Sequence, residues 1–381
     1  MSFLPTSLRR VALAGVIHIL LAAPAFARER WTPEQADGWL QKHSWLVGCN
    51  FIPSSAINQL EMWNADSFDS ETIDRELGWA HGLGYNSLRV FLHHQLWQDD
   101  REGFLKRMEQ FLDIAAKHKI GVMFVLLDGV WDPLPKAGKQ PAPRPHVHNS
   151  GWVQSPGAEL LGDPKRHAEL KPYVQGVIRH FRNDPRVQAW DLFNEPENPN
   201  TNSYGERGNR TELRNKAKMA TLLLRELFVW ARAAEPTQPL TVGVWLGPWP
   251  DHAQMSEIEK LMVEQSDVIS FHNYGDLGQL KPRIEQLRRY ERPILCTEYM
   301  ARPAGSRFDP LLGFLKEQKV GAYNWGFVAG KAQTQYPWDS WQKKYTAEPE
   351  LWFHEIFHPD GKGYDLREVE YIRQVTGAKS E

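Results

Sequence analysis

Two apolar runs of this chain each lead directly into a carboxylate. The run VQAWDLF, residues 187–193, is followed by Asn194 and Glu195, and the run PILCT, residues 293–297, is followed by Glu298. A carboxylate buried without a partner is energetically expensive, so a carboxylate at the end of a buried strand calls for an explanation. Two facing carboxyls whose surroundings hold their pKa values apart can divide proton transfer and nucleophilic attack between them. We therefore predict that Glu195 and Glu298 are catalytic side chains.

The order of strand-like and helix-like segments predicts how these carboxylates meet. Such segments alternate from residue 45 onward, which indicates a parallel sheet. Eight strands that are apolar on both faces fit a single closed (β/α)8 barrel, in which the C-terminal strand ends surround one site. A doubly wound open sheet is the alternative, but no Gly-rich phosphate turn follows the first strand. The predicted strands cover residues 45–49, 86–93, 120–128, 187–193, 240–247, 268–274, 293–300 and 320–328.

Further polar and aromatic side chains occupy the ends of the predicted strands. In a barrel these positions face the same pocket as the two catalytic carboxyls, so they become candidates for binding the substrate. Asp191 lies deeper in the fourth strand and is expected to have a structural partner inside the barrel, whereas Glu197 is expected at the rim. The predicted binding residues are Arg89, His93, His94, Asp128, Trp131, Asn194, Trp245, His272, Tyr274 and Trp325.

A long segment without clear periodicity, residues 132–164, follows the third strand. Loops of this length in a compact domain are usually functional or disordered. Because the segment contains Trp152 and several histidines, we expect it to form an ordered wall beside the site. The helices at residues 70–84 and 211–235 are expected to begin at Ser70 and Thr211 as N-caps.

Composition and charge limit the class of partner. The chain has 16 Trp, 17 Phe and 11 Tyr, which suits either a large core or a cleft that stacks sugar rings. Without residues 1–27 the chain keeps 43 basic and 47 acidic residues, a net charge of −4, and it has no basic stripe. Neither nucleic acid nor a membrane surface is therefore expected as a partner, and the protein is expected to be a monomer or a small homo-oligomer.

The N-terminus has the composition of a secretory signal peptide. Arg9 and Arg10 precede an apolar run at residues 11–23, and a small-residue pattern ends at Ala27. We expect cleavage after Ala27, secretion or export to the periplasm, and one catalytic domain over residues 28–381. An uncleaved anchor is the alternative, although the apolar run is short for a bilayer span.

Other chemistries lack their usual sequence patterns. His93, His94, His146 and His148 could gather a zinc ion, but neither H-E-x-x-H nor Cys-x-x-Cys spacing is present. The chain also has no G-x-S-x-G elbow of a serine hydrolase and no Walker loop. We predict neither a metal nor another cofactor.

The chain has two cysteines, Cys49 and Cys296, each in an apolar strand-like run. Buried free thiols are the expected state in such surroundings. Both lie on odd-numbered predicted strands, which share layers in a barrel, so a disulfide between them is the alternative.

Taken together, the strand-end motifs resemble those of glycoside hydrolase family 5, the cellulase and mannanase family of the clan A retaining β-glycosidases. The likeness covers nearly the whole chain in the order of its elements. It rests on Asn-Glu-Pro at residues 194–196, His-x-Tyr at 272–274 and Thr-Glu-Tyr at 297–299, together with Arg89 and Trp325.

The resemblance implies a reaction and a role for each carboxyl. Glu195 would be the general acid and base, and Glu298 would be the nucleophile that forms a glycosyl-enzyme ester. Retaining enzymes of this kind hold their carboxyls about 5–5.5 Å apart. The expected substrates are β-linked, with β-1,4 glucan or mannan and their oligosaccharides first among them.

The resemblance also implies supporting roles. Asn194 would bind the sugar 2-hydroxyl, and Trp325 would form the stacking floor of the −1 subsite. Tyr274 would orient the nucleophile, and His272 would lie near the acid. Arg89 would lower the pKa of the nucleophile by its opposite charge.

One position departs from the family pattern, because Asp128 stands where the family usually has a histidine. His93 or His94 could fill that space from the second strand. The long loop after the third strand could close one end of the cleft, which would favour an exo-acting enzyme on an unusual bacterial or host glycan. A non-catalytic carbohydrate-binding barrel is the remaining alternative.

Overall fold

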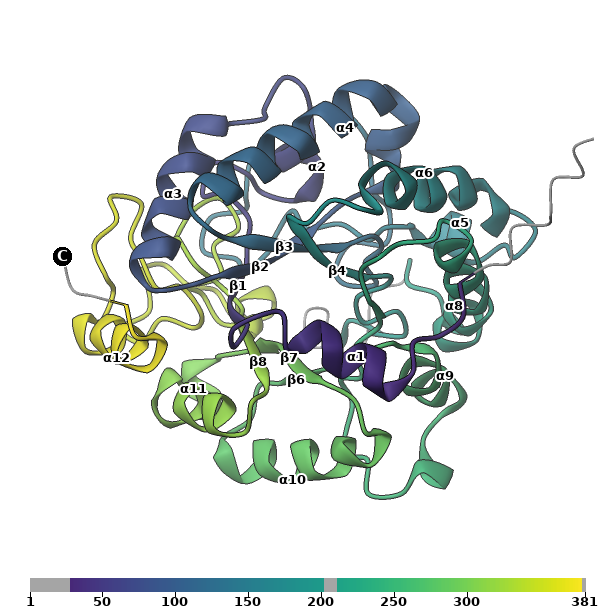
Figure 1. The fold of residues 1–381 in the computed structure, drawn as a ribbon. Helices are drawn as coiled ribbons and strands as arrows, with labels where there is room; N and C mark the ends of the chain where they lie inside the picture. The colour runs from purple at the N-terminus through teal and green to yellow at the C-terminus, as the bar shows by residue number, and fades with distance from the viewer. Residues whose placement is uncertain (1–27, 202–210, 379–381) are drawn as a thin grey trace, which may run out of the picture.

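The computed structural model describes residues 28–201 and 211–378, and in it eight parallel strands form a barrel surrounded by helices (Figure 1). The strands follow one another around the barrel in the order β5-β4-β3-β2-β1-β8-β7-β6. This arrangement confirms the predicted (β/α)8 fold. The strands are β1 Val47–Asn50, β2 Ser87–Phe91, β3 Gly121–Val125, β4 Val187–Asp191, β5 Leu240–Thr241, β6 Ile269–Asn273, β7 Ile294–Tyr299 and β8 Gly321–Asn324.

The barrel closes between its fifth and sixth strands just beyond the short β5. Val244 forms a parallel bridge with Phe271. The Val244 N–H donates to the Ser270 carbonyl at 3.0 Å, and the His272 N–H donates to the Val244 carbonyl at 3.1 Å. The regular part of β5 is two residues long, whereas the sequence predicts a strand over residues 240–247.

The main helices lie outside the barrel and cover the outward faces of the strands (Figure 1). Outward side chains such as Phe124 and Trp190 belong to the large core cluster shared with these helices. The helices are α3 Ser70–Gly82, α4 His94–Lys117, α6 Lys171–Phe181, α8 Lys216–Arg232, α9 Glu257–Gln265, α10 Leu277–Leu287, α11 Phe308–Glu317 and α12 Leu366–Thr376, with short α2 Gln59–Trp63 and α5 Ala158–Leu161.

Two expected helix starts are wrong. Asp69, not Ser70, is the N-cap of α3, and its side chain accepts from the Thr72 N–H at 3.0 Å. Helix α8 begins at Lys216 after Asn215, and Thr211 lies in the turn before it. Acidic and polar residues are interchangeable as caps, so the sequence predicts a helix more reliably than its first residue.

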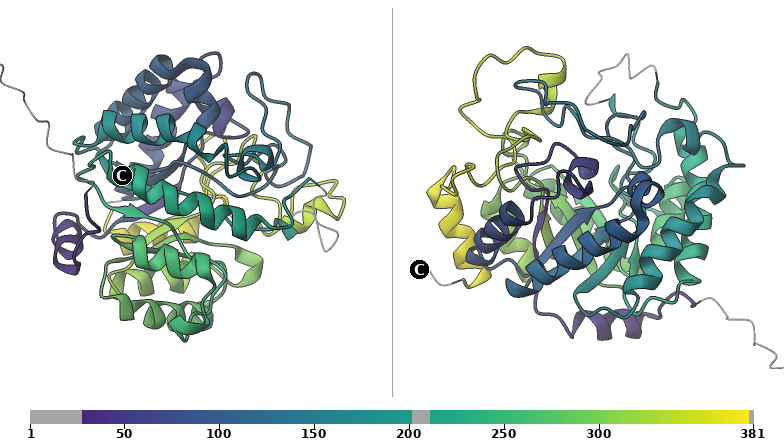
Figure 2. Two further views of the ribbon diagram at one scale, coloured as in Figure 1. Left: turned by 90° about the vertical axis from the view of Figure 1, so that its right-hand side faces the viewer. Right: turned by 90° about the horizontal axis from the view of Figure 1, so that it is seen from above.

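The interior of the barrel changes from apolar to polar along its axis. Helix α1, Pro33–Leu40, closes the end opposite the long loops, as Figure 2 shows in its right-hand view. Trp39 of α1 packs there in one cluster with Met123, Leu295 and Tyr323. Toward the other end the buried side chains are charged, with Arg89 at its centre. The apolar end provides stability, and the polar end provides the site.

In the part of the chain that the structure describes, no helix is both long and apolar enough to span a bilayer. The predicted signal peptide, residues 1–27, lies outside the described residues.

Cys49 and Cys296 are both buried and both free, so the alternative of a disulfide is wrong. Burial raises the pKa of each thiol. A buried protonated thiol reacts slowly with disulfide reagents. We therefore expect the native protein to show almost no reaction with Ellman's reagent, and the protein denatured without reductant to show two thiols per chain. A count of zero after denaturation would instead mean that the two cysteines are bridged.

Candidate active site

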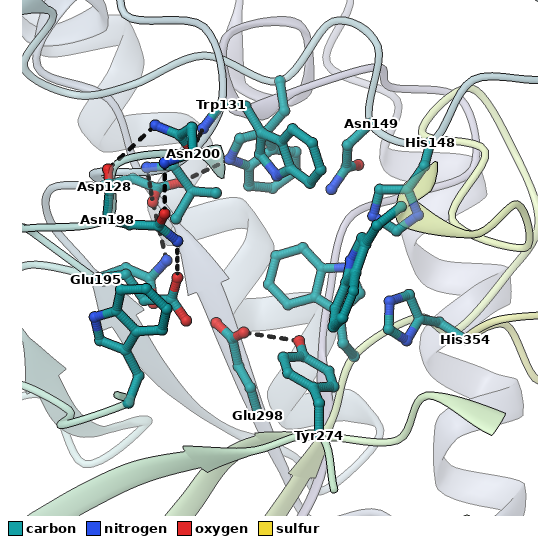
Figure 3. A pocket seen from close by; sticks show the side chains of 16 residues that line it. Asp128, Trp131, His148, Asn149, Glu195, Asn198, Asn200, Tyr274, Glu298 and His354 are labelled. Carbon is teal, nitrogen blue, oxygen red and sulfur yellow. Dashed lines mark hydrogen bonds between the residues drawn. The ribbon is translucent and has the colours of Figure 1, made fainter. Parts of the chain in front are cut away.

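The C-terminal ends of the strands surround a pocket that contains both predicted catalytic carboxyls (Figure 3). Eight of the twelve predicted site residues line it, and the other four, Arg89, His93, His94 and His272, do not. The eight are Asp128, Trp131, Asn194, Glu195, Trp245, Tyr274, Glu298 and Trp325.

Glu195 and Glu298 lie next to each other with His272 between them. One side-chain oxygen of each glutamate and one ring nitrogen of His272 all lie within 4.8 Å of one another. His272 Nδ1 is 2.7 Å from Glu195 Oε1 and 3.6 Å from Glu298 Oε2. The two carboxyls therefore face the same point of the pocket, where both could act on one substrate bond.

Glu298 is held at both carboxylate oxygens. Arg89 donates to Oε1 at 2.8 Å, and the Tyr274 hydroxyl donates to Oε2 at 2.8 Å. Burial raises the pKa of Glu298, while nearby His272, the charge of Arg89 and the Tyr274 hydrogen bond act against that rise. Arg89 lowers the pKa of Glu298, as expected. The pKa is nevertheless raised above its ordinary value, because the effect of burial is larger than that of Arg89.

Arg89 is fully buried below the pocket, so it does not contact a substrate as predicted. Besides Glu298, its guanidinium donates to Asp191 Oδ2 at 2.8 Å, to Asn194 Oδ1 at 2.7 Å and to Asn50 Oδ1 at 2.8 Å. The predicted structural partner of Asp191 is therefore Arg89. This one side chain connects residues of β1, β4 and β7 and the turn after β4.

Glu195 has different surroundings from Glu298. Asn198 Nδ2 donates to its Oε2 at 2.5 Å, and His272 Nδ1 contacts its Oε1. Burial raises the pKa of Glu195 to about 7, and the Asn198 hydrogen bond opposes that rise. Its backbone has a φ of 39°, in the left-handed region that non-glycine residues rarely adopt. Glu195, which has no direct cationic contact, is thus the carboxyl suited to hold a proton near neutral pH.

A buried lysine fixes the loop that carries Asn198. Lys216 Nζ donates to the Gly129 carbonyl at 2.6 Å, the Asn198 carbonyl at 2.8 Å and Glu212 Oε2 at 3.0 Å. These bonds connect the loops after β3 and β4. They hold the Asn198 amide against Glu195.

Asp128 takes part in holding Asn194. Its Oδ1 accepts from Asn194 Nδ2 at 2.9 Å, and its Oδ2 accepts from Trp152 Nε1 at 2.6 Å. Burial raises the pKa of Asp128 to about 6. Asn194 is thus held at both ends of its amide, with Arg89 donating to Oδ1 and Asp128 accepting from Nδ2.

The prediction that His93 or His94 fills the space beside Asp128 is wrong. His93 Nδ1 accepts from the Gln95 N–H at the start of α4, and its Nε2 contacts the Gln154 carbonyl. His94 Nδ1 contacts Ser155 Oγ at 2.9 Å. Both rings are buried and stack on each other, so they anchor the end of the long loop and do not reach the pocket.

Glu197 is not a rim residue, because it is buried behind Trp245. Trp245 Nε1 donates to Glu197 Oε1 at 3.0 Å. Burial raises the pKa of Glu197 to about 8. This bond holds the Trp245 ring at the pocket wall.

Two loops far apart in sequence form one side of the pocket. The loop after β3 and the loop after β8 join where the Asn149 N–H donates to the Ala332 carbonyl at 2.8 Å and Trp341 Nε1 donates to the His148 carbonyl at 2.6 Å. Trp131 also stacks on Trp341 with ring centroids 5.5 Å apart. The expected ordered wall is thus present, but half of it comes from residues after β8.

Eight pocket residues were not among the predicted site residues, although Trp152 and the histidines of its segment were expected in a wall beside the site. They lie in irregular segments without periodicity, and only the abundance of Trp and His in those segments pointed to them. They are Val130, His148, Asn149, Trp152, Asn198, Asn200, Trp338 and His354.

Glu195, His272 and Glu298 form the one group of three potential metal ligands among the described residues. The guanidinium of Arg89 is already 2.8 Å from Glu298. A cation at this position would be repelled by Arg89 and would compete with Tyr274 for Glu298 Oε2. Hydrogen bonding accounts for the cluster without an ion.

No family model and no curated protein sequence matches the chain. Solved structures do match. They include the endo-1,4-β-D-mannanase of Thermotoga petrophila (16% identity, TM-score 0.54, 88% of this chain and 99% of that chain). The β-1,4-mannanase of the sea hare Aplysia kurodai has 18% identity and a TM-score of 0.53, over 80% of this chain and 94% of that chain. GH5_18 of Streptomyces cattleya in complex with GlcNAc has 13% identity and a TM-score of 0.54, over 89% of this chain and 82% of that chain. At these identities the likeness establishes the barrel fold.

We expect Arg89→Met to destabilise the protein strongly. The substitution leaves Asp191 and Glu298 buried without their cation, which should lower the free energy of unfolding by about 3–5 kcal/mol. Urea denaturation measures the loss. Arg186→Met, which removes partly exposed ion pairs with Asp184 and Asp113, is the control and should cost about 1 kcal/mol or less. Equal losses for the two variants would contradict a central role for Arg89.

Proposed function

We propose that the protein is a retaining β-glycoside hydrolase of the family 5 type. The observation that carries this proposal is the close approach of two buried carboxyls, Glu195 and Glu298, whose hydrogen-bond partners differ. Such a pair is the minimum machinery for cleaving a glycosidic bond by double displacement.

In the first step Glu298 attacks the anomeric carbon while Glu195 gives its proton to the leaving oxygen. The bond from the anomeric carbon to the leaving oxygen breaks, and an ester to Glu298 forms. In the second step Glu195 takes a proton from water, which attacks the same carbon and displaces Glu298. Arg89 and Tyr274 favour the ionised nucleophile, and the pKa of Glu195 near 7 favours the protonated acid.

We propose β-1,4-linked mannan or glucan chains and their oligosaccharides as substrates. The mannanases among the matched structures support the mannan class. The aromatic rings of Trp131, Trp245 and Trp325 line the pocket and offer apolar faces on which sugar rings stack. Export through a signal peptide at residues 1–27 is part of the proposal, because such polymers lie outside the cell.

The two-loop wall favours exo-type action as the second candidate. His148, Asn149 and His354 lie across the pocket from Glu195 in Figure 3, so one end of the pocket is closed by side chains. An enzyme that cuts within a chain needs an open cleft at both ends. Comparing products from reduced mannopentaose and cellopentaose tests this candidate, since exo action releases one short product from the start.

We expect Glu298→Gln to lower kcat by about 10,000-fold or more, because the amide cannot form the glycosyl ester. Aryl β-mannosides and β-glucosides measure the turnover, and NMR of the first-formed anomer should show retention. Glu76→Gln, which changes another buried carboxyl that does not line the pocket, should keep most of the activity. Sugar binding without hydrolysis by the unaltered protein would instead indicate a binding barrel, and a first product of inverted configuration would reject the role of Glu298.

We expect the alkaline limb of kcat/KM to follow the ionisation of Glu195. Activity needs the protonated acid, so it should fall as the pH rises through an apparent pKa near 7. Asn198 donates to the ionised carboxylate and lowers this pKa, so Asn198→Ala should move the limb to higher pH. A limb that stays in place, or moves to lower pH, would contradict the contact with Asn198.

A further inference from the structure

Two residues of the pocket have backbone conformations that residues other than glycine rarely adopt. Glu195, the proposed acid, has a φ of 39°, and Trp131, whose ring lines the pocket beside it, has a φ of 74°. Such conformations are strained and persist only where the surrounding structure holds them. The contacts that hold these two backbones therefore help to set the geometry of the pocket.

The backbone of Trp131 is held at both its N–H and its carbonyl. The N–H donates to Asn200 Oδ1 at 2.8 Å, and the carbonyl accepts from Gln154 Nε2 at 3.0 Å. The same two amides, through Asn200 Nδ2 and Gln154 Nε2, each donate to Glu212 Oε2 at 2.6 Å. Glu212 thus fixes both of the side chains that hold Trp131.

The backbone of Glu195 is enclosed between Gly129 and Asn198. Its carbonyl accepts from the Asn198 N–H at 3.0 Å, and its Oε2 accepts from Asn198 Nδ2. Gly129 lies directly against the same carbonyl, since a Cβ at this glycine would be 2.3 Å from the Glu195 oxygen. Lys216 Nζ donates to the carbonyls of both Gly129 and Asn198. Lys216 thus joins the two residues that enclose Glu195.

Lys216 and Glu212 are the two halves of one buried ion pair. Nζ lies 3.0 Å from Oε2, and the side chains are 3% and 6% exposed. Neither side chain lines the pocket, so neither contacts a substrate there. A buried ion pair gives little net stability compared with apolar side chains of similar size, so stability alone does not account for it. What the pair provides is a fixed position for each of the groups bonded to it.

We propose that the Glu212–Lys216 ion pair is a positioning unit that holds Glu195 and Trp131 in their strained conformations, and that acid catalysis depends on it. This inference rests on the proposed glycosidase function and adds residues that act through Glu195. Asn200, Asn198 and Glu195 lie along the same side of the pocket (Figure 3). A displacement of about 1 Å in a reacting group can cost about 100-fold in rate, so a loosened Glu195 would donate its proton poorly. An ion pair that only stabilises the loops is the competing explanation.

Aryl glycosides with different leaving groups separate positioning from stability. Dinitrophenolate leaves without a proton, whereas the phenyl compound needs one from the acid. We expect Lys216→Met to lower kcat/KM by about 30-fold or more on phenyl β-mannoside or β-glucoside, but by less than about 3-fold on the dinitrophenyl glycosides. Arg302→Met breaks another buried ion pair, with Glu368, outside the pocket lining. This control should keep the ratio of the two rates that the unaltered protein shows.

A second variant guards against loss of folding. Glu212→Gln combined with Lys216→Met leaves no unpaired charge buried, so it should fold with a smaller loss and show the same dependence on the leaving group. Equal losses on the phenyl and dinitrophenyl glycosides would mean that the pair is only structural. That result would overturn the inference and leave the glycosidase function standing.

If the unaltered protein hydrolyses neither glycoside, the proposed function fails, and crystal structures of the unaltered protein and the double variant then decide the inference. A Glu195 carboxyl that leaves Asn198, or a Glu195 or Trp131 backbone that leaves the left-handed region, supports the positioning role. Unchanged conformations of both residues reject it.

Discussion

Arg89 places a permanently charged guanidinium inside the barrel, where it donates to Asp191, Glu298, Asn194 and Asn50. The planar fork of an arginine can serve several acceptors at fixed angles, which a lysine cannot do. The acceptors come from widely separated parts of the chain, and all of them are buried. The polar end of the barrel depends on this ion, because without it two carboxylates would be buried without compensation.

The unequal states of the two catalytic carboxyls follow from the position of Arg89. Glu298 contacts the guanidinium and a phenol hydroxyl, whereas Glu195 contacts an amide and a neutral imidazole. Burial raises the pKa of both carboxyls, but only Glu298 has a direct cationic partner against it. When two nearby carboxyls share one proton, it resides on the one without the cation. The surroundings of Glu195 and Glu298 are therefore enough to make one carboxyl the acid and the other the nucleophile.

The barrel supplies the reaction centre, and the two loops supply the shape of the pocket. Loops after β3 and β8 hold each other through the backbone bond from Asn149 to Ala332, the bond from Trp341 Nε1 to the His148 carbonyl, and the stacked rings of Trp131 and Trp341. His93 and His94 belong to this support, since they anchor the end of the first loop at Gln154 and Ser155. Fold and selectivity are thus separated, because different loops on the same strands would present different side chains to the substrate.

By itself the sequence determined the eight strands, the carboxyls that end two of them and most of the residues at the other strand ends. These features are local, because strand runs have a clear apolar pattern and a barrel always gathers their C-terminal ends. Only the tertiary structure decided that Arg89 is a buried hub, that His93 and His94 face the loop, and that Glu197 lies behind Trp245. It also decided the pocket wall around Asn149 and His354. Those outcomes depend on contacts between segments far apart in sequence, from 48 residues for Trp245 with Glu197 to 209 for Arg89 with Glu298. Irregular loops have no periodicity from which such contacts could be predicted.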